Sequence, residues 1–387
     1  MSHSVATPRF HATILVCVWF FIHVGLWHHY GLRTLNDSVF YLEAARFLAT
    51  HGYLADADYW FYSIPMACLA LCSLLTDEPG ILFVIVQSIV SGLATLALYK
   101  TAATLFGNAR SGLMAAALYI LWWDMIHWNV AIMTESFGAS SICFVLYTLV
   151  HFRGKPYDYL RILLCVIVAV LTRPTGILVV PGVLIFFALR YWHSLRKSGI
   201  RIAGIGLLTL GLLLAGAHYM FTHWDFTDQY GRGNIVTYAD TLIGTPLYHS
   251  GLQLHDPLRM PGPEATGLSR ILLFITYNPL YFFKAMALKI GFLLSGMRPY
   301  YSTVHNAFTV CWNTLVYAGC IVGVRKVGNR PIAAFAVGVI VLNVLLVGIS
   351  SVDWDNRFLL PMVPPLVLLA SGLCVGCNRI VDTLHKS

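Results

Sequence analysis

The chain alternates between long apolar runs and short polar stretches from one end to the other. A helix needs about 20 mainly apolar residues to cross a bilayer. The pattern predicts an all-α polytopic membrane protein with about ten transmembrane helices in a single membrane domain, residues 1–387. Residues 1–10 are polar and show no cleavage-site pattern, so we expect the first helix to be retained. The runs that fit a spanning helix are residues 11–30, 81–100, 111–128, 136–151, 160–171, 177–190, 202–221, 306–324, 332–350 and 358–377.

Two further apolar stretches, residues 62–75 and 280–294, are ambiguous. Loops on the cytoplasmic side are rich in Lys and Arg. The four basic loops lie on the same side of the membrane only if neither of these two stretches crosses it. We therefore predict that both stretches are amphipathic juxtamembrane helices on the outer face. The remaining ten spans then place both termini in the cytoplasm. All acidic residues except Asp158 and Asp382 then lie outside. The basic loops are residues 100–110, 153–161, 190–201 and 325–330.

Composition agrees with a membrane protein, since 58% of the residues are hydrophobic and only 11% are charged. Soluble domains carry roughly 25% charged residues. The net charge of +8 does not indicate nucleic-acid binding, because the basic residues are scattered over short loops. The nine Cys are mostly in apolar runs, and Cys374 and Cys377 form a lone CxxC without a second pair. We therefore expect no metal site and no cofactor, although a divalent metal is left open.

Two outer segments carry the unusual sequence, the first loop at residues 31–80 and a long loop with a surface helix at residues 222–303. In the first loop, Asn36-Asp37-Ser38 precedes a helical pattern over residues 39–50 that Gly52 ends. Asp37 is then either the cap of this helix or a general base that the helix dipole keeps ionised. Sequence leaves these two alternatives open.

A second outer carboxylate, Glu135, opens a later span and is again either a first-turn acid or a functional group. Asp124 is a weaker candidate, because the neighbouring Trp122, Trp123 and Trp128 look like an aromatic belt at the membrane interface.

Two arginines stand on short outer turns, Arg173 in Thr172-Arg173-Pro174-Thr175-Gly176 and Arg357 in Asp353-Trp354-Asp355-Asn356-Arg357. Arginine suits a bidentate grip on phosphate. The alternative is that each anchors to lipid headgroups. The spans carry almost no charge, which argues against a carrier or pump.

Together these residues resemble the GT-C superfamily of polyprenyl-phosphate-dependent glycosyltransferases, with patterns close to the protein O-mannosyltransferases and the lipid A aminoarabinose transferase. Asp37 leads into Tyr41, Ala45, Leu48 and Gly52, as an acidic residue leads into the family's Tyr-x-x-x-Ala-x-x-Leu-x-x-x-Gly helix. The remaining matches are Tyr62-Ser63-Ile64-Pro65, Glu135, Thr172-Arg173 and Arg357-Phe358-Leu359-Leu360-Pro361. Ser38 departs from the pattern, since the family has a second acid there.

The resemblance implies a membrane glycosyltransferase that moves a hexose or pentose, with inversion, from a polyprenyl-phosphate donor to a glycan, lipid or protein acceptor. It implies Asp37 and Glu135 as catalytic residues and Arg173 and Arg357 as donor phosphate-binding residues. It implies further that Tyr41, Tyr62, Asp353 and Asp355 bind substrate.

The expected location is a bacterial inner membrane, with the active site on the periplasmic face. The protein would then act on cell envelope glycans among membrane lipids. The alternatives are a polysaccharide polymerase or ligase, a lipid-linked sugar flippase and a non-catalytic scaffold.

The long loop at residues 222–270 mixes aromatic and hydrogen-bonding side chains with many Gly and Pro residues. Aromatic faces and polar edges suit a sugar ring. We predict that this loop covers the site and sets the choice of acceptor, the alternative being a disordered connector.

Overall fold

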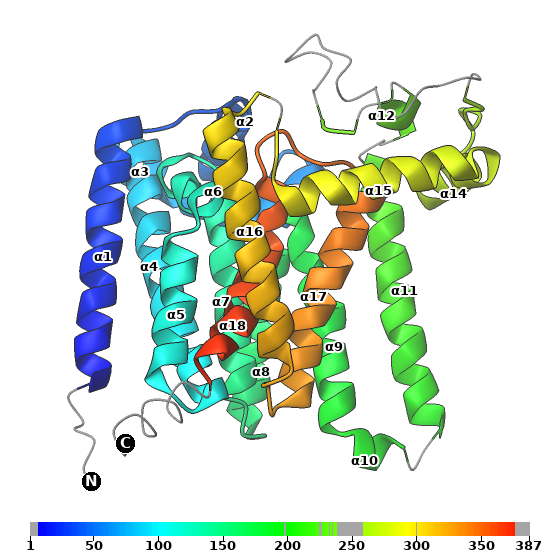
Figure 1. The fold of residues 1–387 in the computed structure, drawn as a ribbon. Helices are drawn as coiled ribbons and strands as arrows, with labels where there is room; N and C mark the ends of the chain where they lie inside the picture. Colours follow the sequence, from blue (N-terminus) through cyan, green and yellow to red (C-terminus); the bar gives the residue numbers. More distant parts are fainter. Residues whose placement is uncertain are drawn as a thin grey trace. The chain divides into compact units, whose positions relative to one another are not determined.

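The computed structural model describes residues 7–196, 199–223, 227–231, 233, 235–237, 258–298 and 300–375. Within these residues the chain is helical, and extended pairing is limited to two isolated bridges (Figure 1). The all-α prediction is confirmed. The chain divides into two compact units, one of Met1–Val180, Val316–Val337 and Leu360–Ser387, the other of Pro181–Leu315 and Gly338–Leu359.

The first unit is built on α4 (Pro79–Phe106), which packs against most of the other helices of the unit. Its partners include α1 (Thr7–Tyr30), α5 (Ala109–Ile120), α7 (Glu135–Val150) and α18 (Val363–Ala370). Helix α8 (Pro156–Val170) packs against α7.

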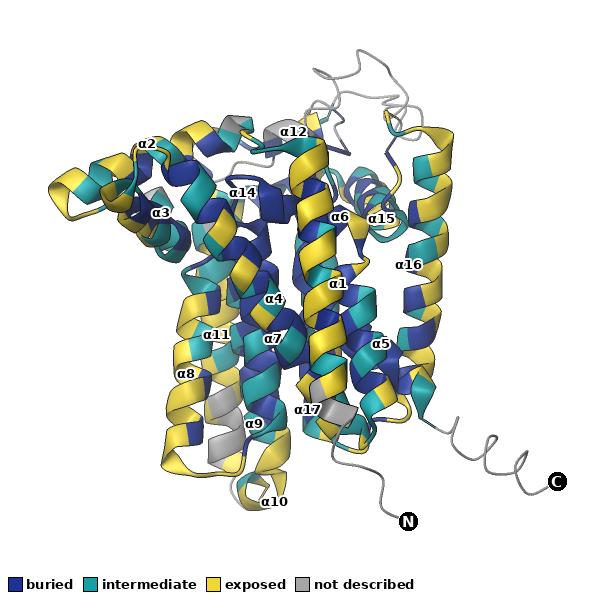
Figure 2. Ribbon diagram, turned by 90° about the vertical axis from the view of Figure 1, so that its left-hand side faces the viewer, coloured by how far each residue is buried: buried dark blue, intermediate teal, exposed yellow. Residues whose placement is uncertain are grey.

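Helices α2 (Asn36–His51) and α3 (Ser63–Leu75) pack on each other and lie at one end of α4 and α7 (Figure 2). Gly52 ends α2 as predicted. It has a φ of 79°, and its N–H donates a hydrogen bond to the carbonyl of Leu48. The helix begins at Asn36, and Leu35 occupies the cap position. The interpretation of Asp37 as the helix cap is therefore wrong.

The second unit contains α9 (Val179–Arg190), α10 (Trp192–Leu195), α11 (Gly199–His223), α12 (Thr227–Gly231), α14 (Gly267–Tyr277) and α15 (Pro279–Ser295). Most of α17 (Arg330–Ile349) also lies in it, and α16 (Thr303–Val324) runs through both units. Helix α15 crosses the ends of α11 and α17 instead of running beside them (Figure 1).

Among the described residues, five helices are long and apolar enough to span a bilayer, or six if α14 and α15 form one span broken by a 110° bend. Shorter apolar helices include Glu135–Val150 and Pro174–Arg190. The total of ten spans stays a prediction. Many apolar side chains on the spanning helices point outward, Phe20, Phe21 and Leu93 among them. An exposed apolar surface of this kind fits lipid contact.

Two predicted spans are interrupted. The run at 111–128 ends as a regular helix at Ile120 and continues as buried short turns, α6 (Trp123–Ile126) and the 3₁₀ helix His127–Val130. The run at 358–377 forms α18 between two 3₁₀ helices, because its prolines lack the N–H donor that a continuous α-helix needs.

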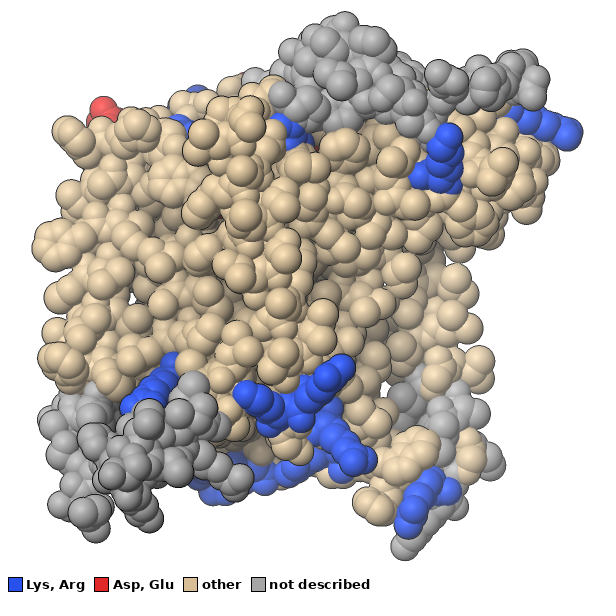
Figure 3. Space-filling view, viewed as in Figure 1, with Lys and Arg blue, Asp and Glu red and all other residues tan. Residues whose placement is uncertain are grey.

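Three of the four basic loops belong to the first unit, and contacts place them at one end of it. Thr104 Oγ1 and His151 Nε2 are 3.2 Å apart, which joins the loops after α4 and α7. Lys326, in the loop after α16, donates to the carbonyl of Val375. Lys and Arg side chains are visible at the lower end and again along the upper edge, and the broad surface between them is uncharged in this view (Figure 3). This supports the expectation that these loops share one side of the membrane.

Candidate active site

The first loop is fixed beside the start of α7 by backbone pairing. The N–H of Arg33 donates to the carbonyl of Val130 at 2.9 Å, and the N–H of Ile132 donates to the carbonyl of Arg33 at 3.0 Å. The hydroxyl of buried Ser38 donates to the carbonyl of Ile132 at 2.8 Å and accepts the N–H of Leu35. Ser38, which stands where the resembled motif has its second acid, therefore joins the two segments.

Asp37 lies half-buried in the first turn of α2, and Tyr41 lies buried one turn further on. The rings of Tyr41 and Tyr62 are tilted against each other, with centroids 5.5 Å apart. Burial raises the pKa of Tyr41 well above its usual value, Tyr62, Glu135 and Asp37 raise it further, and Arg173 lowers it. The Tyr41 hydroxyl therefore stays protonated.

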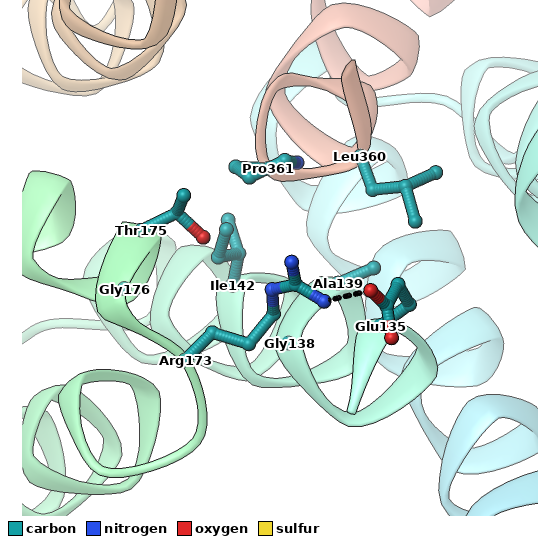
Figure 4. A pocket seen from close by; sticks show the side chains of 9 residues that line it. All are labelled: Glu135, Gly138, Ala139, Ile142, Arg173, Thr175, Gly176, Leu360 and Pro361. Atoms are coloured by element: carbon teal, nitrogen blue, oxygen red, sulfur yellow. Dashed lines mark ion pairs between the residues drawn. The ribbon is translucent and has the colours of Figure 1, made fainter. Parts of the chain in front are cut away.

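Glu135, the first residue of α7, forms a buried ion pair with Arg173, which follows the end of α8 (Figure 4). Their side chains are 1% and 9% exposed. Arg173 Nη1 also donates to Thr134 Oγ1 at 3.3 Å. A carboxylate and a guanidinium buried this deeply are stable only because each compensates the charge of the other.

Glycine makes room for this pair. A Cβ atom at Gly138 would lie 2.8 Å from Cδ of Arg173, so the arginine can cross α7 only where a glycine stands. The pair borders a small cavity of about 10 Å³, lined also by Ala139, Thr175 and Pro361 (Figure 4).

A buried polar network lies under the turn that leads to Glu135. Gln87 Nε2 donates to the carbonyls of Trp128, Asn129 and Ala131, and Ser88 donates to that of Asn129. The side chain of Asn129 forms hydrogen bonds to His23 and Ser91 through Nδ2. Its Oδ1 accepts a hydrogen bond from the hydroxyl of Ser136. Sequence reasoning missed these residues, and their only signal was polar types inside apolar runs.

The aromatic-belt interpretation of the same region is wrong for two of its three tryptophans. Trp122 and Trp128 are 1% and 0% exposed, whereas Trp123 is 42% exposed. Two indole rings enclosed by protein pack the turn and do not face headgroups.

In the second unit, the turn after α17 holds a second ion pair, between Arg357 Nε and Asp353 Oδ2 at 2.9 Å. Asp353 is buried, and Arg357 is partly exposed. Tyr301 donates from its hydroxyl to Asp355 Oδ1 at 2.9 Å. Asn356 has a φ of 58° and donates from Nδ2 to the carbonyl of Gly296. This left-handed residue lets the turn fold back on itself.

Sequence reasoning also missed Arg298, which is buried. Its Nε and Nη2 donate to the carbonyl of Asp353 at 3.1 and 2.7 Å, and its Nη1 donates to the carbonyls of Phe292 and Met297. Arg298 thus ties the turn to the end of α15.

The described part of the long loop packs against the same turn. Val236 and Val352 form a parallel bridge, and the N–H of Thr237 donates to the carbonyl of Val352 at 2.8 Å. The disordered-connector interpretation is wrong for this stem, residues 227–237 as far as they are described. Most side chains on which the sugar-binding prediction rests lie outside the described residues: Trp224, Asp225, Asn234, Tyr238, Asp240, Tyr248 and His249.

The structure therefore groups the predicted site residues within each unit. Asp37, Tyr41, Tyr62, Glu135 and Arg173 gather in the first, and Asp353, Asp355 and Arg357 in the second. In the part of the chain that is described, no three His, Cys, Asp or Glu side chains form a group that would hold a metal ion.

Comparisons with known proteins bear on the fold of the chain. A family model described as dolichyl-phosphate-mannose-protein mannosyltransferase matches residues 64–218, less than half of the chain. A solved structure of the archaeal oligosaccharyltransferase AglB from Archaeoglobus fulgidus, in complex with an inhibitory peptide and a dolichol-phosphate, matches with a TM-score of 0.51 at 14% identity. No curated protein sequence matches.

The alignment with AglB covers 99% of this chain and 52% of that enzyme, so this chain spans about half of its length. The resemblance found in the sequence is confirmed: the chain is a polytopic membrane protein with the fold of the GT-C superfamily. The family match includes Glu135 and Arg173, whereas Asp37, Tyr41 and Tyr62 precede it.

Proposed function

We propose that this protein is a membrane glycosyltransferase that moves a sugar from a polyprenyl-phosphate donor to an acceptor on the outer face of the membrane. The observation that carries the proposal is the buried Glu135–Arg173 pair beside Tyr41 and the half-buried Asp37. Glu135 begins α7, at the end of that helix opposite the basic loop at residues 153–161, for which the sequence predicts the cytoplasmic side. A lipid-phosphate donor in the outer leaflet would meet such a site from within the bilayer.

In the proposed reaction Asp37 is the general base. It accepts the proton of an acceptor hydroxyl, whose oxygen bonds to the anomeric carbon as the bond from that carbon to the phosphate oxygen breaks. The displacement inverts the anomeric carbon and releases polyprenyl phosphate. Asp37 suits this role because it is more accessible than Glu135.

Arg173 and Arg357 are the proposed phosphate-binding groups. Each is already paired with a carboxylate, which fixes the planar guanidinium before donor arrives. Fixed cations stabilise the charge that develops on a leaving phosphate better than mobile ones do. Glu135 acts in this scheme by orienting Arg173.

We propose that Tyr41 and Tyr62 bind the sugar, because a protonated phenol is a hydrogen-bond donor and an aromatic face covers the C–H side of the ring. Asp353 and Asp355, in the turn before Arg357, are proposed to bind substrate as well. The sugar, the acceptor and the bacterial inner-membrane location belong to the proposal as well.

The test is turnover by the purified protein in detergent with polyprenyl-phosphate sugars that carry a radioactive label, with acceptor glycans, lipids and peptides supplied in turn. Transfer of label with release of polyprenyl phosphate supports the proposal. Movement of intact donor across a reconstituted bilayer without release would show a flippase. Transfer of whole oligosaccharides would show a polymerase or ligase.

A further inference from the structure

Lys289, in the middle of α15, is buried with no exposed surface. Lysine is almost never fully buried unless its charge has a partner. Lys284 on the same helix is exposed, so a lysine on α15 is not in itself unusual. The proposed chemistry gives Lys289 no role, although burying an amine has a considerable energetic cost.

The partners of Lys289 lie at the end of a different helix. Its Nζ donates to the carbonyl of Ser350 at 2.6 Å and lies 3.5 Å from the centroid of the Tyr230 ring. The hydroxyl of Tyr230 donates to the carbonyl of Ile349 at 2.6 Å. Burial, and then the nearby Tyr281, raise the pKa of Tyr230, so this hydroxyl keeps its proton.

These contacts cap α17, which ends at Ile349. The last carbonyls of a helix have no partner within the helix, so they accept hydrogen bonds from donors elsewhere in the protein. Lys289 and Tyr230 provide the partners from α15 and from the stem of the long loop. Tyr281, also on α15, donates to the carbonyl of Tyr230 and joins these two segments.

The capped end leads directly into the turn that carries Arg357. Val352 is bridged to Val236, the carbonyl of Asp353 is held by Arg298, and the carboxylate of Asp353 pairs with Arg357. Loss of the cap would release Ser350 and with it the starting point of this turn.

We propose that Lys289 is a positioning residue for Arg357: by capping α17 it fixes the turn at residues 351–357 and couples that turn to the stem of the long outer loop. The inference rests on the proposed function, because it takes Arg357 as a donor phosphate-binding group. Lys289 itself contacts neither substrate. Its loss should weaken donor binding more than it slows the chemical step.

The kinetic test compares Lys289→Met, which keeps most of the volume, with the matched control Lys284→Met. We expect Lys289→Met to raise the KM for the donor about tenfold, the change that corresponds to about 1.4 kcal/mol of binding free energy, with kcat within about twofold. Lys284→Met should match the wild type. An unchanged donor KM in a folded Lys289→Met protein, or a loss confined to kcat, would overturn the proposal.

Tyr230→Phe covers the case in which Lys289→Met does not fold, because it removes one hydroxyl and keeps the ring against Nζ. It should raise the donor KM by a smaller factor in the same direction. A donor KM equal to that of the wild type would count against the coupling.

A measurement without turnover separates this inference from the proposed function. The substitution Trp354→Cys is introduced into the Lys289→Met and Lys284→Met proteins. Alkylation of this cysteine is then followed over time by mass spectrometry of the peptide that contains it. Faster alkylation with Lys289→Met alone supports positioning of the turn, even if no polyprenyl-phosphate sugar is a substrate. Equal rates would refute it, even if the enzyme is active.

Discussion

At the scale of single residues, the Glu135–Arg173 ion pair is expected both to stabilise the fold and to hold Arg173 in place for the donor phosphate. Arg173→Ala would leave the Glu135 carboxylate buried without its partner, and loss of one member of a buried pair costs about 3–5 kcal/mol of stability. The double variant Glu135→Gln, Arg173→Met should recover much of that loss while remaining inactive. Thermal unfolding of the single and double variants in detergent measures this. Equal stability of Arg173→Ala and wild type would mean that the charges are not coupled.

Asp37 allows a cleaner test because it is half-buried. We expect Asp37→Asn to lower kcat about 10²- to 10⁴-fold, the typical contribution of a general base. The exposed Glu43 on the same helix is the matched control, and Glu43→Gln should keep full activity. Near-normal turnover of Asp37→Asn, at normal expression, would move the role of base to Glu135.

Donor affinity distinguishes the phosphate-binding role of the arginines from headgroup anchoring. Lys provides a point charge in place of the planar fork, so Arg173→Lys and Arg357→Lys should each weaken donor binding. Binding of a polyprenyl phosphate, measured by its protection against thermal unfolding, reports this without turnover. Donor affinity that is unchanged even in the alanine variants would return both arginines to the anchoring interpretation.

At the scale of elements, α7 is shaped by the arginine that crosses it. Ala is favoured over Gly within a helix by about 1 kcal/mol. Gly138→Ala should nevertheless reduce activity, because its Cβ would lie 2.8 Å from Cδ of Arg173 and displace the guanidinium. Gly204 on α11 has open space around its Cβ position, so Gly204→Ala is the control. Steady-state kinetics decide the matter, and a fully active Gly138→Ala enzyme would show that Arg173 adapts.

Sequence predicted elements better than it predicted their interruptions. Apolar runs and glycine stops located α1, α2 and α4 because these depend on local pattern. The turn after Ile120 was missed, since it depends on Gln87 donating to three carbonyls about forty residues away in the chain. Arg298 was missed for the same reason, because its partners are main-chain carbonyls and any residue type provides such a carbonyl.

At the scale of the whole molecule, two features of the sequence pointed to the candidate site residues. They are the short motifs and the basic loops, whose distribution predicts which side of the membrane each loop faces. The motifs located Asp37, Tyr41 and Glu135, which the fold brings near one another. Sequence could not show that Ser38 bonds to the Ile132 carbonyl, nor that both arginines are paired with carboxylates. Pairing and burial arise from tertiary packing, which a one-dimensional pattern does not contain.

The orientation of the chain in the membrane is the prediction on which the location of the site depends. The loop around Gly328 is basic, whereas Asp77 is an exposed acidic residue between α3 and α4. Because cytoplasmic loops are enriched in Lys and Arg, a single cysteine at Gly328 should face the cytoplasm and one at Asp77 the outside. In a cysteine-free background and sealed right-side-out vesicles, a membrane-impermeant maleimide should label position 77 at once and position 328 only after lysis. Immediate labelling at 328 would reverse the orientation and place Asp37 and Glu135 on the cytoplasmic face, where a donor in the outer leaflet could not reach them.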